Sequence, residues 1–290
     1  MPSAALNANV RGMLLAAAAG LTFSVLNVNL RVLATELPPF QVQFLRYATG
    51  LLVLAPWIIH SGLGAYRTYA VSGQLWRGVV HASGLFCWFA ALPHIPFANL
   101  TAIGFTGPIF VMLGAVAFLG EKLIWQRWVA ALVGFAGVMV VVAPGLSGAG
   151  GGYSLLMLAS APMFAASFLI TKAMTRRDSP EVIVAWQSLT VSLFTLPAAL
   201  WAWEWLSLRQ WTLILLCGGL GTLGHFLLTT AFKLADISTA QPVKFLDLIW
   251  AAALGYLFFA EVPDRATLIG ALVIFGATTW IARVEAMRRP

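Results

Sequence analysis

The side chains best suited to chemistry lie inside apolar segments, where a charge is costly. Lys244 and Asp247 stand three residues apart in the apolar segment 239–260, so a helix would present both on one face. Because a charge at the centre of a bilayer costs roughly 2.5–3.5 kcal/mol, the pair needs a reason to be there. Two explanations remain open: the ammonium and the carboxylate bind a zwitterionic substrate, or they neutralise each other so that the helix can enter the membrane.

The same spacing of three extends the pair into a stripe of Gln241, Lys244, Asp247 and Trp250. A polar stripe on a membrane helix faces protein or a water-filled cavity rather than lipid. We therefore predict that these four residues face a central cavity and contact the substrate.

Three more charged or titratable side chains lie within apolar segments. Arg46 could attract an anion, but neutralisation by Glu36 or by a helix carboxyl end is the favoured interpretation. His81 and His225 could relay protons in a cavity, and a histidine satisfied by hydrogen bonds explains them equally well.

The other candidate substrate-binding residues are an amide and four aromatic side chains, Asn27, Phe86, Trp88, Phe105 and Trp186. Aromatic rings can stack on an aromatic substrate or on a cation. For any single ring, packing in the protein core is the favoured alternative. For the amide, the competing explanation is a hydrogen bond between helices.

These side chains must be positioned by helices that cross a membrane. Of the 290 residues, 60% are hydrophobic and only 9% are charged, whereas soluble domains carry about 25% charged residues. A membrane-spanning helix needs about 20 residues, so ten spans with short connections account for the whole chain. The longest connection is a polar loop at 60–74. The sequence therefore predicts an all-α membrane protein with ten transmembrane helices. The predicted spans are 12–34, 40–59, 75–92, 96–119, 125–142, 153–172, 181–203, 211–234, 239–260 and 266–281.

An internal repeat relates the two halves of the chain. The stretch 91–122 matches 231–262 at an offset of 140, which places Phe105 on Phe245 and Glu121 on Glu261. Such repetition indicates a duplication, and we place the repeats at 1–144 and 153–290 around a Gly-rich linker at 145–152. Five spans is an odd number, so the second repeat must enter from the opposite side. The predicted fold class is thus a 5+5 inverted-topology repeat, which allows alternating access.

Other matches follow an offset of 141. Phe23 matches Phe164, and Pro39 matches Pro180, where both prolines are predicted to open a helix. The repeat also aligns the polar stripe with smaller residues of the fourth span, which would leave space for a substrate. Those residues are Thr101, Gly104 and Gly107, followed by Phe110 opposite Trp250.

Proline and glycine mark the places where helices should bend. Pro108 and Pro242 each remove a backbone N–H from a predicted span, and Gly104 and Gly107 precede the first of them. Interrupted helices at the midplane are where transporters place binding sites and hinges. We predict hinges at these four residues, and a static kink is the alternative.

The distribution of Lys and Arg indicates the orientation. If the amino terminus is cytoplasmic, most basic residues lie at cytoplasmic span ends, and only Arg31, Arg209 and Arg265 lie at outer ends. We therefore predict a multi-pass protein of a bacterial inner membrane with both termini in the cytoplasm. The net charge of +7 is spread over span ends and does not indicate nucleic-acid binding. The expected partners are the bilayer and a small-molecule substrate, and a monomer is compatible with the sequence.

Three stretches resemble the EamA branch of the drug/metabolite transporter superfamily: PPFQVQFLRY at 38–47, ALPHIPFANLTAI at 91–103 and GPIFVMLGAVAFLGEKL at 107–123. The resemblance covers nearly the whole chain and is weaker in the second half. It implies ten helices in an inverted repeat and transport of small metabolites. The implied cavity is lined by the first, third, fourth, sixth, eighth and ninth spans. Many bacterial members export amino acids, aromatic ones among them, and the motif does not specify the substrate.

We therefore expect a secondary transporter, not an enzyme, that exports small metabolites such as amino acids by alternating access. The sequence has no ATP-binding motif and no metal-binding motif, so no cofactor or metal is predicted. If protons drive transport, Asp247 or a cavity histidine is the coupling candidate. The alternative is a membrane enzyme or flippase acting on a lipid-linked substrate, disfavoured because no nucleophile, acid and base cluster in the sequence. A channel is disfavoured because an inverted repeat favours alternation over a fixed pore.

Overall fold

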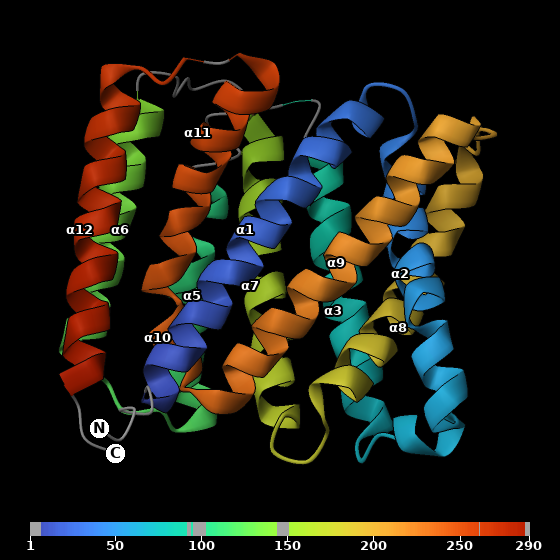
Figure 1. Cartoon of the computed structure of the whole chain (residues 1–290), viewed down its shortest axis with the longest axis horizontal. Helices are drawn as coiled ribbons and strands as arrows, with labels where there is room; N and C mark the ends of the chain where they lie inside the picture. Colours follow the sequence, from blue (N-terminus) through green and yellow to red (C-terminus); the bar gives the residue numbers. More distant parts are fainter. Residues whose placement is uncertain (1–6, 92–93, 95–102, 144–150, 261, 288–290) are drawn as a thin grey trace, which may run out of the picture.

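A computed structural model describes residues 7–91, 94, 103–143, 151–260 and 262–287, and every element in these ranges is a helix (Figure 1). The α-helices of residues 1–143 are α1 Ala8–Ala34, α2 Pro39–Ser61, α3 Val71–Ala91, α5 Gly107–Leu119 and α6 Trp125–Val142. Those of residues 151–287 are α7 Gly151–Met174, α8 Pro180–Trp201, α9 Leu208–Leu234, α10 Ile237–Ala240, α11 Leu246–Phe259 and α12 Arg265–Met287. Two short 3₁₀ helices are η1 Leu63–Tyr66 and η3 Pro242–Phe245.

The predicted class of all-α membrane protein agrees with these helices. In the described ranges, eight helices are long and apolar enough to cross a bilayer, counting 237–259 as one. The helix α5 is shorter and apolar, and α3 is a 21-residue helix that carries Gln74, Arg77 and His81. The fourth predicted span is described only from residue 103, so the total of ten spans stays a prediction.

Local sequence explains where several helices begin. Pro39 and Pro180 occupy the first turns of α2 and α8, as the repeat predicts, because proline lacks an N–H that the first turn does not need. A capping box starts α9, in which Ser207 and Gln210 each satisfy a backbone N–H of the other.

The ends of α5 and α11 show the same local structure at an offset of 140. Gly120 follows α5 at φ 69°, and its N–H donates to Ala115 O. Ala260 follows α11 at φ 54°, and its N–H donates to Gly255 O. A left-handed alanine is strained, so its presence indicates that the packing of the repeat unit imposes this ending in both halves.

The loop predicted at 60–74 is shorter in the structure. The helix α2 continues to Ser61 and α3 begins at Val71, four residues before the predicted start of the third span. Polar residues suggested a loop there, but Gln74 is buried and donates to Thr68 and to Asp178. Long-range hydrogen bonds therefore allow a polar segment to be helical.

The two halves of the chain interleave rather than pack as separate bodies. The helix α1 packs along α9, α3 along α7, α6 along α12, and α2 on both α8 and α9 (Figure 1). Small residues permit the closest approach: a Cβ at Gly218 of α9 would lie 2.7 Å from the backbone nitrogen of Gly50 in α2. Large apolar side chains such as Phe118, Trp201 and Leu272 cover the outside, as expected for a surface that faces lipid.

We call the end of the bundle where α1 begins and α12 ends the terminal end, and the opposite end the far end (Figure 1). The chain enters α1 from the terminal end and enters α7 from the far end, so the two halves run in opposite senses.

Candidate functional site

A cavity of about 350 Å³ lies inside the bundle. Its wall is apolar and aromatic over much of its area, with two cations, two histidines and two amides. Among the described residues, no carboxylate lines it. The lining residues are Phe23, Leu26, Asn27, Arg46, Tyr47, His81, Leu85, Trp88, Gly104, Gly107, Pro108, Val111, Met157, Ser160, Ala161, Phe164, Ala165, Phe168, His225, Gln241 and Lys244.

All six spans that the family resemblance implied contribute to this wall, and α2 contributes as well. The additional residues are Arg46 and Tyr47. Tyr47 lies in the stretch 38–47 that carries the resemblance, but no spacing in that stretch indicates that its side chain points inward.

A chain of buried polar groups crosses the cavity. The Tyr47 hydroxyl lies 2.8 Å from Nε2 of His81 and 3.3 Å from Nε2 of His225. On the other side of the first histidine, Nδ1 lies 3.1 Å from the hydroxyl of Ser167. Helices α2, α3, α7 and α9 are thus joined through one tyrosine and two imidazoles, although the two histidines are 144 positions apart in the sequence.

The partners of His225 define its protonation at this site. Nη2 of Arg46 lies 3.4 Å from Nε2 of His225, and the side-chain nitrogen of Gln187 lies 3.5 Å from the same atom. A guanidinium can only donate a hydrogen bond, so this contact fits a neutral ring with a lone pair on Nε2 and its proton on Nδ1.

Arg46 differs from the favoured sequence interpretation. Glu36 does not neutralise it, because the Glu36 carboxylate accepts two hydrogen bonds from Arg209 at 2.8 and 3.0 Å outside the bundle core. Arg46 instead points into the bundle, where its guanidinium stacks over the Tyr47 ring at 4.6 Å. The predicted pairing with Glu36 was wrong because the turn after α1 directs Glu36 toward the start of α9.

The predicted pair in the ninth span forms as an ion pair. Nζ of Lys244 lies 2.7 Å from Oδ2 of Asp247, and the ammonium also lies over the Phe23 ring at 5.8 Å. A Cβ at Gly20 of α1 would collide with the Asp247 carboxylate, so the absence of a side chain there admits the acid. Mutual neutralisation is therefore present, and contact with a zwitterion stays a prediction.

The stripe reaches the cavity only at its first half. Gln241 and Lys244 line the cavity, whereas Asp247 and Trp250 do not. Pro242 interrupts the span, and the chain forms the 3₁₀ helix η3 before α11 resumes. Residues three apart eclipse in a 3₁₀ helix, which keeps Gln241 and Lys244 on one face. In the α-helix α11 a spacing of three moves each side chain about 60° around the axis, so Asp247 and Trp250 leave the cavity face.

The predicted hinge residues lie beside this interruption and in the matching region of the first half. Gly104, Gly107 and Pro108 line the cavity, and residues 105–106 form a turn just before α5. Thr101 lies outside the described residues. Both bent segments therefore border the cavity, and their movement stays a prediction.

The remaining aromatic candidates divide into two groups. Trp88 lines the cavity, as do Asn27 and the repeat-matched pair Phe23 and Phe164. The pair was recognised as a sign of duplication rather than as a site.

Four aromatic candidates do not line the cavity, namely Phe86, Phe105, Trp186 and Trp250. Phe86 is 54% exposed on the outside of α3. Phe105 stacks on Phe245 with ring centroids 5.8 Å apart. The indole N–H of Trp186 donates to Tyr66 O at 2.9 Å near the terminal end. That of Trp250 is buried and has no hydrogen-bond partner among the described residues.

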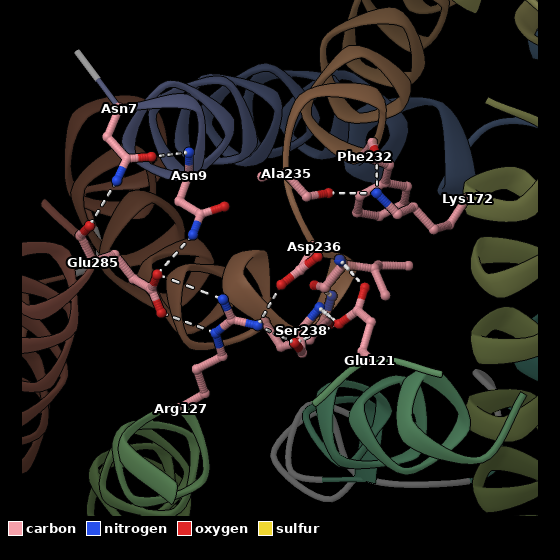
Figure 2. Close-up of polar contacts among 12 residues, drawn as sticks. Asn7, Asn9, Glu121, Arg127, Lys172, Phe232, Ala235, Asp236, Ser238 and Glu285 are labelled. Carbon is pink, nitrogen blue, oxygen red and sulfur yellow. Dashed lines mark hydrogen bonds and ion pairs between the residues drawn. The ribbon is translucent and has the colours of Figure 1, made fainter. Parts of the chain in front are cut away.

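Charged residues close the terminal end of the bundle between the two halves (Figure 2). Glu121, at the end of the fourth span, accepts hydrogen bonds from the N–H of Ile237 at 2.6 Å and from the N–H and hydroxyl of Ser238 at 3.1 and 2.5 Å. A carboxylate at the first turn of a helix satisfies N–H groups that have no partner within it. The acid that ends the apolar run of the family motif thus fixes the start of the ninth span. Its match, Glu261, lies outside the described residues.

Arg127 of α6 is the centre of a second set of contacts at this end (Figure 2). Its Nε lies 2.9 Å from Oε1 of Glu285, and its Nη1 lies 2.9 Å from Oδ2 of Asp236 and 2.8 Å from the hydroxyl of Ser238. The Arg127 and Glu285 side chains are only 2% and 0% exposed. Asn9 of α1 donates to the same Glu285 carboxylate at 2.7 Å. We call Glu121, Arg127, Asp236, Ser238 and Glu285 the terminal cluster.

Lys172 reinforces the neighbouring part of this end. Its ammonium donates to Phe232 O and Ala235 O, both at 2.6 Å, and so satisfies carbonyls at the end of α9 (Figure 2). The terminal cluster and Lys172 together tie the terminal ends of α6, α7, α9, α10 and α12 to one another.

A comparison with protein families matches the chain twice. The EamA-like transporter family matches residues 10–143 and 152–283, which together make up most of the sequence. The two matched segments correspond to the two halves that the internal repeat predicts.

Curated relatives with similar sequences are transporters. The chain is 35% identical to a riboflavin transporter of Rhizobium johnstonii, covering 97% of this chain and 93% of the relative. It is 31% identical to an S-adenosylmethionine uptake transporter of Rickettsia bellii, covering 88% and 87%. It is 30% identical to a pseudopaline exporter of Pseudomonas aeruginosa, covering 94% and 96%. A solved crystal structure with 20% identity has the same fold, at a TM-score of 0.81 over 96% of this chain and 99% of the other.

Proposed function

We propose that this chain, which belongs to the EamA-like transporter family, is a secondary carrier that moves a small metabolite across a bacterial inner membrane by alternating access. Small-molecule transport agrees with the family and with the relatives. The observation that carries the proposal is a largely apolar cavity with a few polar groups inside the bundle, together with the terminal cluster that joins the two halves at the terminal end.

The packing supports a 5+5 inverted repeat of ten helices, with repeats at 1–144 and 153–290 around the linker 145–152. Replacing each helix by its equivalent in the other repeat turns one helix contact into another. The contact of α1 with α9 becomes that of α7 with α3, and the contact of α2 with α9 becomes that of α8 with α3; all four pairs are in contact. Likewise the contact of α1 with α11 becomes that of α7 with α5, while the pairs α2 with α8 and α6 with α12 each become themselves. Phe105 and Phe245, equivalent at an offset of 140, stack on each other, as residues beside a two-fold axis would. Such symmetry makes two oppositely open states similar in energy.

The terminal cluster indicates the side of the membrane on which this conformation is closed. The cavity lies inside the bundle, and carboxylate–guanidinium contacts join the two halves of the chain across the terminal end. We place both termini in the cytoplasm, as the distribution of Lys and Arg predicts. The structure then represents a state closed to the cytoplasm, and the terminal cluster must separate to expose the cavity to that side.

We propose amino acids or similar metabolites, aromatic ones included, as substrates and export as the direction. The cavity volume suits a small ligand, and its apolar wall with few polar groups is typical of a small-molecule site. The relatives include uptake and export proteins, so the direction depends on the coupling rather than on the fold. Of the predicted binding residues, we assign contact with substrate to those that line the cavity: Asn27, His81, Trp88, His225, Gln241 and Lys244.

The test is counterflow into proteoliposomes that contain the purified full-length chain. Vesicles are loaded with one unlabelled compound and then exposed to a trace of the same labelled compound. The panel holds the standard amino acids, riboflavin and S-adenosylmethionine. A carrier gives saturable uptake that the internal compound accelerates. Failure of every compound, or uptake that rises linearly with concentration and ignores the internal compound, would refute the proposal.

A further inference from the structure

Arg46 is a buried cation in the cavity that no acidic side chain of the described structure contacts. The residue is 9% exposed and lines the cavity wall. Nη2 reaches Nε2 of His225 at the long distance of 3.4 Å, and the Nε atom is buried with no hydrogen-bond partner among the described residues. Buried guanidinium groups are normally paired with an acid, so a bare one facing a cavity needs a partner.

The chain has ten acidic residues, and the positions of the nine described ones leave Arg46 unpaired. Glu36, Glu121, Asp236, Asp247 and Glu285 hold the cationic or helix-start partners given above. Asp178 accepts from Thr68 and Tyr69, and Asp264 accepts from Thr267. Glu181 and Glu204 are exposed. The tenth, Glu261, lies outside the described residues, in the sequence just after the far end of α11.

The other charged groups of the cavity wall cancel or are neutral. Lys244 is paired with Asp247 at 2.7 Å. The contact of Arg46 with Nε2 of His225 fits a neutral imidazole. Among the described residues, one uncompensated positive charge therefore remains on the cavity wall, and it belongs to Arg46.

Glycine permits the close packing of Arg46 on α9. A Cβ at Gly221 of α9 would lie 3.1 Å from Nε, so a larger residue there would push the guanidinium out of its present position. Aromatic rings of Phe23, Trp88 and Phe164 form the wall around the same cavity. The arrangement suits a ligand with an apolar or aromatic body and an anionic head.

We propose that the carried metabolite bears an oxyanion, a carboxylate or a phosphate, that binds the guanidinium of Arg46. The planar guanidinium donates parallel hydrogen bonds that match the geometry of either oxyanion. The ligand supplies the negative charge that the protein lacks at this position. This inference rests on the proposed carrier function and narrows its substrate to anions and to zwitterions with a carboxylate.

The test uses matched pairs of small compounds that differ in charge at one group. Phenylacetate is compared with phenylacetamide, and phenyl phosphate with phenol, by the rise in unfolding temperature of the full-length protein in lipid nanodiscs. We expect the anion of at least one pair to bind at least tenfold more tightly than its neutral match. The pair that responds tells carboxylate from phosphate.

Substitutions of Arg46 test whether this residue causes the preference for anions. Arg46→Gln is expected to abolish the preference, and Arg46→Lys, which keeps the charge without the planar fork, is expected to retain part of it. Arg209→Gln is the matched control, since Arg209 is exposed and pairs with Glu36 outside the cavity. Size-exclusion profiles show whether each variant is folded, and recovery of preference in the lysine variant distinguishes a ligand contact from a structural role.

The inference fails if neutral compounds bind as well as anions, if no compound of either pair binds, or if folded Arg46→Gln keeps the preference. The proposed function is judged separately by counterflow. Saturable counterflow of a neutral metabolite that is unaffected by Arg46→Gln would overturn the inference and leave the carrier function standing.

Discussion

Removing Arg127 should destabilise the protein by an amount that depends on Glu285. In Arg127→Leu the Glu285 carboxylate loses its guanidinium contacts at 2.9 and 3.4 Å while remaining 0% exposed, and only the Asn9 amide still reaches it. Breaking a buried ion pair by removing one partner costs about 3–5 kcal/mol. Because the Asn9 hydrogen bond remains, we expect a value near the lower limit, about 3 kcal/mol.

The second variant separates the ion pair from packing. In Arg127→Leu/Glu285→Leu both buried charges are gone, and Asp236, whose side chain is 47% exposed, returns to water. Replacing a buried ion pair by apolar side chains is often neutral, so the double variant should recover most of the loss. The coupling energy from the double-mutant cycle is therefore expected to be about 2 kcal/mol or more.

The assay is thermal unfolding of the single and double variants in detergent. At roughly 2 °C per kcal/mol for a chain of this size, the single variant should unfold about 6 °C lower, and the double variant should lie close to the wild type. Arg283→Leu is the matched control, because Arg283 is exposed on the same helix as Glu285. Additive effects of the two substitutions, with coupling near zero, would refute the assignment of a buried ion pair.

Three further predictions concern the cavity and the far end. Asp247→Asn should slow uptake and remove its dependence on pH if this acid couples protons; unchanged rate and pH dependence would eliminate it as the candidate. Gly221→Ala should weaken anion binding by a factor of roughly 3–10, because the new methyl group displaces the guanidinium of Arg46 by a few tenths of an ångström. Gly219→Ala is the control and should not weaken binding, because the space around Gly219 is open. Equal effects of the two substitutions would contradict the geometry. Hydrogen bonds from Arg209 lower the pKa of Glu36 below its ordinary value, so the stabilisation is complete above about pH 4.5 and is lost as the pH falls through the lowered pKa. Glu36→Gln should flatten the unfolding temperature between pH 3 and 5, and an unaltered profile would contradict this.

Much of the fold follows from patterns that are local in sequence. The lengths of the apolar segments predict most spans to within a few residues. The offset of 140 pairs positions with the same backbone conformation, such as the left-handed Gly120 and Ala260. The predicted stripe failed beyond η3, because a spacing of three does not stay on one face of the α-helix α11.

The long-range contacts were beyond these patterns. Arg127 and Glu285 appear in the sequence as charges near span ends, and only the packing of α6 on α12 turns them into a buried pair. Tyr47 links two histidines from distant helices, a contact that no spacing indicates. The charge of Arg46 was visible, but its lack of an acidic partner required the position of every acid in space.

The central claim is that the terminal end opens when the carrier works. Spin labels at Lys122→Cys and Arg176→Cys report on it, because both residues are exposed at the terminal end and belong to opposite halves of the chain. The buried thiols Cys87 and Cys217 are replaced by serine. The account predicts one short distance without substrate and an added, longer distance when a compound that gives counterflow is present. A single unchanged distance in protein that transports that compound would contradict the account.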